Sequence, residues 1–141
     1  MPAGADRTVA VDSSLAVPLL LRDHEAHVRA LVWRSRRQLS ICGRAWIETY
    51  AVLTRLPGGA RVLPEDAVQL LEANCSPPLS PSPDTFVGAV ALLAAAGVAG
   101  GASHDGRVAL AALEHRAVLA TRDARAEAAY RRLEVEIESV P

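Results

Sequence analysis

Lysine is absent from the 141 residues, and all 15 basic side chains are arginines. A Walker A phosphate loop needs a lysine on the nucleotide phosphates, so the sequence excludes that class of NTPase. Schiff-base chemistry on a lysine amine is excluded for the same reason. The absence also argues against receiver domains and haloacid-dehalogenase-type phosphatases, which place a lysine near their aspartates.

Cysteine and aromatic residues are scarce. Cys42 and Cys75 lie far apart, without a CxxC pair or paired histidines, so the sequence indicates neither a zinc site nor a disulfide framework. We expect both cysteines to be buried thiols in a reducing compartment. Aromatic residues make up 4% of the chain and hydrophobic residues 50%. This mixture favours packed helices over a β-sandwich.

Long hydrophobic runs are missing as well. The longest, residues 86–102, is mostly alanine, glycine and valine and is too short and too weakly apolar to span a bilayer. The first residues do not show the pattern of a secretory signal peptide, which is a basic segment followed by an apolar core and a cleavage site. We therefore expect one cytoplasmic domain over residues 1–141, without membrane association. A net charge of -1 excludes a histone-like nucleic-acid binder but permits a local basic patch.

Segments typical of strands and helices alternate along the chain. Short apolar runs predict strands at residues 8–11, 38–42 and 117–120, an alternating run predicts an edge strand at 135–140, and the proline-rich residues 77–83 include a short edge segment. Helices are predicted at residues 15–21, 24–37, 44–56, 64–74, 86–96, 105–115 and 124–132. This alternation predicts an α/β fold with a mostly parallel sheet of four to five strands flanked by helices. The alanine-rich helix over residues 86–96 is expected to be buried.

Acidic residues follow two of the predicted strands. Asp12 comes directly after the first, and Asp123 follows the strand at residues 117–120. Ligands of parallel α/β folds bind outside the carboxyl ends of the strands, and Asp105 and Glu48 lie near the starts of helices that begin at the same edge. Each acid also has a structural explanation. The three aspartates could complement helix N-termini, and Glu48 could occupy a half-exposed edge position.

Carboxylates gathered at one edge repel one another. Two like charges about 4 Å apart repel by about 4 kcal/mol at an effective dielectric constant of 20, so the cluster needs protonation or a counter-ion. Oxygen ligands without nearby cysteine or histidine favour Mg²⁺, with Mn²⁺ as a possible substitute, over zinc. We expect Asp12, Glu48, Asp105 and Asp123 to hold such an ion.

Three segments carry these acids in a characteristic order: VAVDSS at residues 9–14, AWIETYAVLTRL at 45–56 and SHDGRVALAALEHRAVLATRD at 103–123. Together they resemble the PIN-domain ribonucleases, particularly the VapC toxins of type II toxin–antitoxin systems. The resemblance implies a three-layer PIN-like fold and metal-dependent endonucleolytic hydrolysis of RNA. It assigns the four acids to metal binding and catalysis, and Ser14 and Thr121 to hydroxyls that support the site.

The resemblance further implies a VapB-like antitoxin that blocks the metal site, and a toxin homodimer. The apolar residues 15–21 and Trp33 are expected to offer docking surfaces, unless they belong to the core. The sequence departs from the family pattern at Ser13, His104 and Ala126, and the four acids are intact.

Arginines near the last acid are candidate RNA contacts. Arg122 and Arg125 flank Asp123 closely enough to suggest contact with phosphates. The group Arg34, Arg36 and Arg37 fits a solvated helix face better. For Trp46 and Tyr50, core packing is favoured over stacking on a base.

Two other functions remain open at this point. A noncatalytic PIN-like module that binds RNA or protein would be distinguished by the absence of magnesium-dependent cleavage. His104 and Asp105 also form the dipeptide of HD phosphohydrolases. That family needs further histidines on a helical fold, and the alternating strands argue against it.

Overall fold

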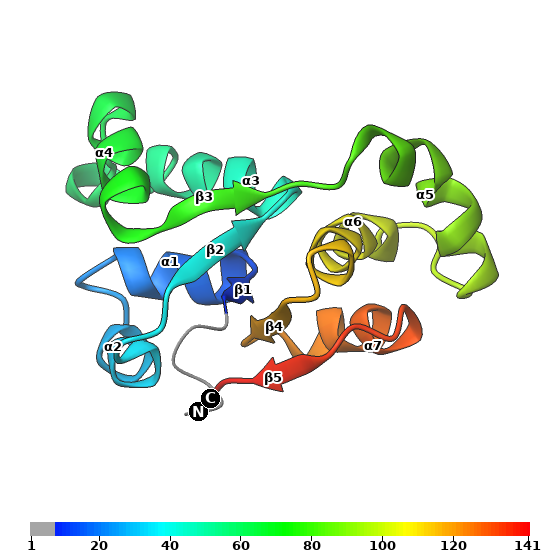
Figure 1. The fold of residues 1–141 in the computed structure, drawn as a ribbon. Helices are drawn as coiled ribbons and strands as arrows, with labels where there is room; N and C mark the ends of the chain where they lie inside the picture. Colours follow the sequence, from blue (N-terminus) through cyan, green and yellow to red (C-terminus); the bar gives the residue numbers. More distant parts are fainter. Residues whose placement is uncertain (1–7) are drawn as a thin grey trace.

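A parallel sheet of five strands lies at the centre of the structure, a computed structural model that describes residues 8–141 (Figure 1). β1 (Val9–Val11) is the middle strand and pairs with β2 (Leu39–Cys42) and β4 (Val118–Thr121). β3 (Ser76–Leu79) and β5 (Ile137–Ser139) form the two edges. The mostly parallel sheet predicted from the sequence is confirmed, including the edge positions of its proline-rich and alternating segments.

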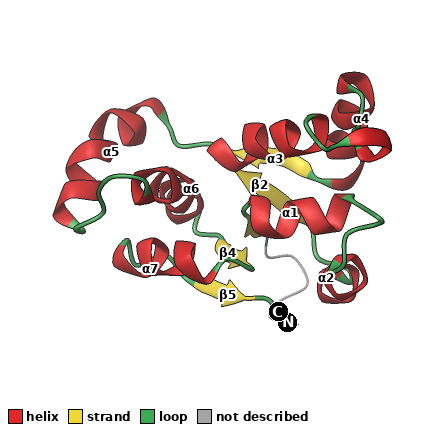
Figure 2. Ribbon diagram, turned by 180° about the vertical axis from the view of Figure 1, so that it is seen from behind, coloured by secondary structure: helices red, strands yellow, loops and turns green. Residues whose placement is uncertain are grey.

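Helices flank both faces of the sheet (Figures 1 and 2). They are α1 (Ser13–Leu20), α2 (His27–Arg34), α3 (Arg44–Thr54), α4 (Pro64–Asn74), α5 (Pro83–Ala95), α6 (Ala102–Glu114) and α7 (Ala124–Arg132), with a short 3-10 turn at Gly58–Ala60. The crossovers through α1 and α3 pack against each other, and α6 packs against α7. Parallel strands need such crossover connections. Because crossovers are right-handed, the group with α1 and α3 and the group with α6 and α7 lie on opposite faces of the sheet.

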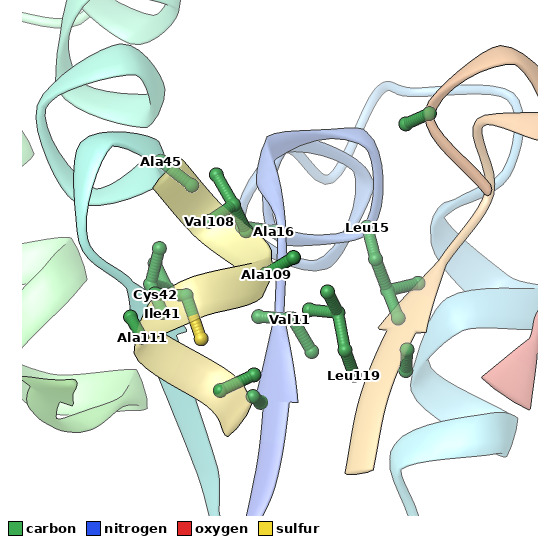
Figure 3. Packing of buried hydrophobic residues seen from close by; sticks show 14 of the residues in the cluster. Val11, Leu15, Ala16, Ile41, Cys42, Ala45, Val108, Ala109, Ala111 and Leu119 are labelled. Carbon is green, nitrogen blue, oxygen red and sulfur yellow. The ribbon is translucent and has the colours of Figure 1, made fainter. Parts of the chain in front are cut away.

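The core forms where the three middle strands meet the helices. Val11, Ile41 and Leu119 are almost completely buried. Figure 3 shows Val108 and Ala109 of α6 beside these strands. Strands that are covered on both faces require continuous apolar runs, which is why the sequence shows no alternation here.

The prediction for the alanine-rich helix is partly wrong. α5 begins at Pro83, three residues earlier than expected, because the Ser82 side chain accepts a hydrogen bond from the Thr85 backbone and caps the helix. The helix is also not buried as expected: Phe86 is 59% exposed and Val90 77% exposed, and Leu93 is its buried residue. The physical reason is that α5 packs chiefly along α6 at the periphery (Figure 2).

The docking surface predicted on residues 15–21 is also wrong. Leu15, Leu19 and Leu20 of α1 are buried, so this segment belongs to the hydrophobic core, the alternative stated above. Trp33 is half-buried and its indole N–H donates to Glu138 (2.8 Å), which ties α2 to the region of β5.

Two smaller expectations have mixed outcomes. Cys42 is buried as predicted, whereas Cys75 is only half-buried. The polar segment expected to be helical from residue 24 to 37 forms the shorter helix α2. Within residues 8–141, no helix combines the length and the apolar character that a membrane span requires.

Candidate metal centre

Asp12 lies where β1 ends and α1 begins, and its carboxylate is 4% exposed. Oδ1 accepts hydrogen bonds from the Ser14 backbone N–H (3.1 Å) and the Ser14 hydroxyl (2.6 Å). Oδ2 accepts from the Thr121 hydroxyl (2.5 Å) and the Tyr130 hydroxyl (2.8 Å). Four donors therefore fix the orientation of a carboxylate that has almost no contact with bulk solvent.

Hydroxyl groups link this acid to the second strand end. The Thr121 hydroxyl also accepts from the Asp123 backbone N–H (3.0 Å), and the Ser14 hydroxyl accepts from the Arg122 backbone N–H (2.8 Å). The expected supporting roles of Ser14 and Thr121 thus correspond to hydrogen bonds that connect the loops after β1 and β4.

Asp123 is an N-cap, as its structural explanation required. Oδ1 accepts from the backbone N–H groups of Arg125 (2.9 Å) and Ala126 (3.3 Å) at the start of α7. Within residues 8–141, Oδ2 accepts no hydrogen bond, so one oxygen orients the side chain and the other is available to a ligand. Capping and ligand binding are therefore compatible at this residue.

Asp105 is the acid at which the negative charges converge. It lies in the first turn of α6, half-buried. Burial raises its pKa, and the charges of Asp123, Asp12 and Glu48 raise it further. Burial likewise raises the pKa of Asp12 despite its hydrogen bonds, and Asp123 adds to the effect. The four predicted acids therefore share one electrostatic environment.

Glu48 is the acid that α3 contributes. The core-facing side of α3 consists of Ala45, Thr49 and Leu53, and Glu48 lies beside it, half-exposed. Its Oε2 accepts from the Arg44 guanidinium at 3.0 Å. The predicted half-exposed edge position is correct for Glu48, yet its charge reaches Asp105.

The four acids supply carboxylate oxygens, the donor type that a hard cation prefers. Among the described residues, no three acidic, histidine or cysteine side chains stand close enough to enclose an ion as they are placed. Burial is the main cause of the raised pKa of Asp105, and the charges of Asp123, Asp12 and Glu48 raise this pKa further while the Arg44 guanidinium lowers it. A divalent cation with oxygen ligands removes this repulsion.

Tyr130 is a site residue that sequence reasoning missed. It is 1% exposed on α7 and reaches Asp12 from seven residues beyond Asp123. The available signal was the apolar face of α7, where Tyr130 follows Ala126 and Ala129 at helical spacing. A buried tyrosine hydroxyl normally has a polar partner, and Asp12 is that partner here.

We expect Tyr130→Phe to lower the free energy of unfolding by about 1–2 kcal/mol, because Asp12 loses one donor while the ring stays in place. Chemical denaturation of the metal-free protein measures this. Tyr50→Phe, a change of a half-buried tyrosine on α3, is the matched control. Equal stability of Tyr130→Phe and the wild type would contradict the assigned contact.

Asp105→Asn is expected to stabilise the metal-free protein at neutral pH. The pKa of Asp105 is higher in the folded state than its ordinary value of 3.8. At pH values between the ordinary pKa and the raised pKa, the folded protein therefore binds more protons than the unfolded protein. The contribution of Asp105 to stability therefore falls as pH rises through that window and stays low above it. In EDTA at pH 7, Asp105→Asn should have a higher melting temperature than the wild type. The difference between the two melting temperatures should vanish below pH 3.8. A variant that is less stable at pH 7 would contradict this electrostatic description.

The arginine predictions separate into two groups. Arg125 is exposed beside Asp123, and Arg122 donates from Nε to the Pro141 carbonyl (3.2 Å). Arg34 donates to the Asn74 carbonyl (2.6 Å), and Arg37 donates to the Trp33 carbonyl, so these two complete helix C-termini. These contacts support a structural role for Arg34 and Arg37, and Arg36 is exposed just beyond the end of α2.

An apolar groove of about 1050 Å³ lies beside the acids. Ile47 of α3 and Phe86 and Val90 of α5 contribute exposed apolar side chains to it. Arg44 and His104, neighbours of the acidic residues, also line it. Trp46 is half-buried and borders the groove while packing against the core, which agrees with its expected packing role.

Comparison with known proteins identifies the family of this chain. The PIN domain family model matches residues 9–132. Ribonuclease VapC27 of Mycobacterium tuberculosis (strain ATCC 25618 / H37Rv) is 47% identical over 129 residues, which cover 92% of this chain and 94% of that protein. Ribonuclease VapC40 of the same strain is 37% identical over 133 residues, 94% of this chain and 98% of that protein. The chain belongs to the PIN-domain family and, within it, to the VapC type.

Solved structures share the fold. A chain of FitAB bound to an IR36 DNA fragment matches with a TM-score of 0.68 at 17% identity, covering 93% of this chain and 94% of that one. A chain of VapBC2 from Rickettsia felis bound to a promoter DNA fragment matches with a TM-score of 0.66 at 12% identity, covering 95% and 99%. At these identities the likeness shows the PIN-like fold alone.

Proposed function

We propose that this protein is a metal-dependent endoribonuclease of the VapC toxin type. The observation that supports the proposal most is the hydrogen-bonded link through the Thr121 hydroxyl, which joins the Asp12 carboxylate to the backbone of Asp123, together with the charges of Asp12, Asp123 and Glu48 that act on Asp105. The names of the two related ribonucleases support RNA as the substrate. Asp12, Glu48, Asp105 and Asp123 would hold Mg²⁺ or Mn²⁺. The chemistry that such an ion supplies is activation of a water nucleophile and stabilisation of charge on the phosphoryl oxygens.

The chain's own residues prepare this site. Ser14, Thr121 and Tyr130 hold the Asp12 carboxylate in one orientation. The α7 cap engages one oxygen of Asp123 and, among the described residues, leaves the second oxygen without a hydrogen bond. Exposed Arg125, together with Arg122, offers positive charge beside Asp123, where an RNA phosphate would lie. Preorganised groups of this kind lower the cost of reorganisation during the reaction.

RNA cleavage with controlled metal content tests the proposal. Purified protein should cleave a mixed RNA oligonucleotide in Mg²⁺, lose that activity in EDTA, and regain it with excess Mg²⁺ or Mn²⁺. RNA binding without cleavage under all these conditions would favour the noncatalytic module. Cleavage that survives EDTA would contradict the metal-dependent chemistry.

A homodimer and a VapB-like antitoxin complete the proposal. From Thr85 to Ser103 the chain carries no charged residue, and much of α5 is exposed. A helix that is apolar on most sides is normally covered by protein, so α5 offers a dimer surface. The VapBC2 and FitAB complexes share this fold and support an antitoxin partner.

Val90→Arg should convert the dimer to a monomer, because it places a charge in the centre of this surface. Light scattering after size-exclusion chromatography measures the mass. Val28→Arg is the matched control, since Val28 is also exposed (70%) but lies on α2. A wild-type monomer at high concentration would contradict the proposed dimer.

A further inference from the structure

Arg44 is the one arginine that forms an ion pair with a residue of the acidic site among residues 8–141. Its guanidinium lies 3.0 Å from Oε2 of Glu48, and both side chains are about one-third exposed (36% and 37%). The same positive charge lowers the pKa of Asp105. Arg44 therefore acts on two acids that come from different helices, α3 and α6.

The local structure gives this arginine little other support. Arg44 is the first residue of α3, where the helix dipole is positive and disfavours a cation. An arginine four residues before a glutamate is also the less favourable order for a pair on a helix. An exposed pair of this type is weak, so it can be exchanged for a stronger partner.

A guanidinium remains charged at any working pH, so it cannot make room for a metal ion by losing a proton. An incoming divalent cation would meet this positive charge next to Glu48 and Asp105. The ion pair also occupies one of the two oxygens through which Glu48 could bind the ion. Full use of Glu48 as a ligand therefore requires the guanidinium to move.

We propose that Arg44 is a resident counter-ion of the acidic site, which a divalent cation must displace from Glu48 when the site is loaded. This inference rests on the proposed metal site. A residue that only orients a metal ligand strengthens metal binding. A counter-ion that competes with the metal weakens it, so the two roles predict opposite effects on metal affinity when the residue is removed.

Titration of Mn²⁺ into the metal-stripped full chain tests the inference, with free Mn²⁺ measured by electron paramagnetic resonance. Arg44→Gln should lower the Kd roughly two- to fivefold, the range expected for the loss of one exposed ion pair. Arg44→Lys keeps a cation near Glu48 and should retain an affinity close to that of the wild type. Arg55→Gln is the matched control, because Arg55 is exposed at the other end of α3.

A double-mutant cycle with Glu48→Gln assigns the effect to the ion pair. Arg44→Gln should give no gain, or a much smaller one, in the Glu48→Gln background. Unchanged or weaker Mn²⁺ binding by folded Arg44→Gln would overturn the inference. An equally large gain in Mn²⁺ affinity from Arg44→Gln in the Glu48→Gln background would also overturn it. A wild-type protein that binds no Mn²⁺ would instead refute the proposed metal site itself.

Discussion

Asp123→Asn is expected to reduce RNA cleavage by roughly 10²- to 10³-fold, the effect typical of losing one preorganised electrostatic group. The substitution removes a charge from the oxygen that is not engaged by α7, and it leaves an amide oxygen to cap the helix. Asparagine is as good an N-cap as aspartate, so the fold should be retained. Initial cleavage rates in saturating Mg²⁺ measure the loss.

Glu127→Gln is the matched control for this prediction. Glu127 lies one turn further along α7, where it contacts Ser139 and Arg131 instead of the acidic site. It should keep nearly full activity. If Asp123→Asn cleaves RNA at the wild-type rate while melting at the same temperature, Asp123 is only a helix cap and its assignment to the metal centre is wrong.

Thr121→Val is expected to lower the free energy of unfolding by about 2–4 kcal/mol, the largest stability effect predicted at the site. The side chain is fully buried, donates to Asp12 at 2.5 Å and accepts from the Asp123 backbone N–H. Valine has nearly the same shape but no hydroxyl. It therefore leaves a buried carboxylate with one donor fewer and a backbone N–H without its acceptor.

Thr121→Ser separates the hydroxyl from the methyl group. It keeps both hydrogen bonds and should recover most of the stability, losing about 1 kcal/mol for the missing methyl. Urea denaturation of the metal-free proteins gives the three free energies. If the serine variant is as unstable as the valine variant, packing and not hydrogen bonding explains the role of Thr121.

The sequence was sufficient to predict the sheet, and it also placed the acidic residues at one edge, because both inferences follow from simple rules. Continuous apolar runs identify strands that are covered on two faces, and Asp12 directly follows one of them. Parallel strands bring their carboxyl ends to one edge, which is why acids from distant segments could be grouped. The individual hydrogen bonds to Ser14 and Thr121 needed the structure.

Other features depend on how helices pack, which the sequence does not reveal. The composition of α5 predicts a covered helix, but it does not say whether the same chain or another molecule covers it. Tyr130 reaches Asp12 only because α7 docks next to β4. The pairing of Arg44 with Glu48 has a spacing of four residues that also occurs on ordinary solvent-exposed helices.

The most direct test of the central claim is anomalous diffraction from crystals of this protein soaked in Mn²⁺. We predict an anomalous peak between the carboxylates of Asp12, Asp105 and Asp123, with Glu48 turned toward it. A peak elsewhere, or no peak in crystals of protein that cleaves RNA, would contradict the claim that these acids converge in order to hold a cation.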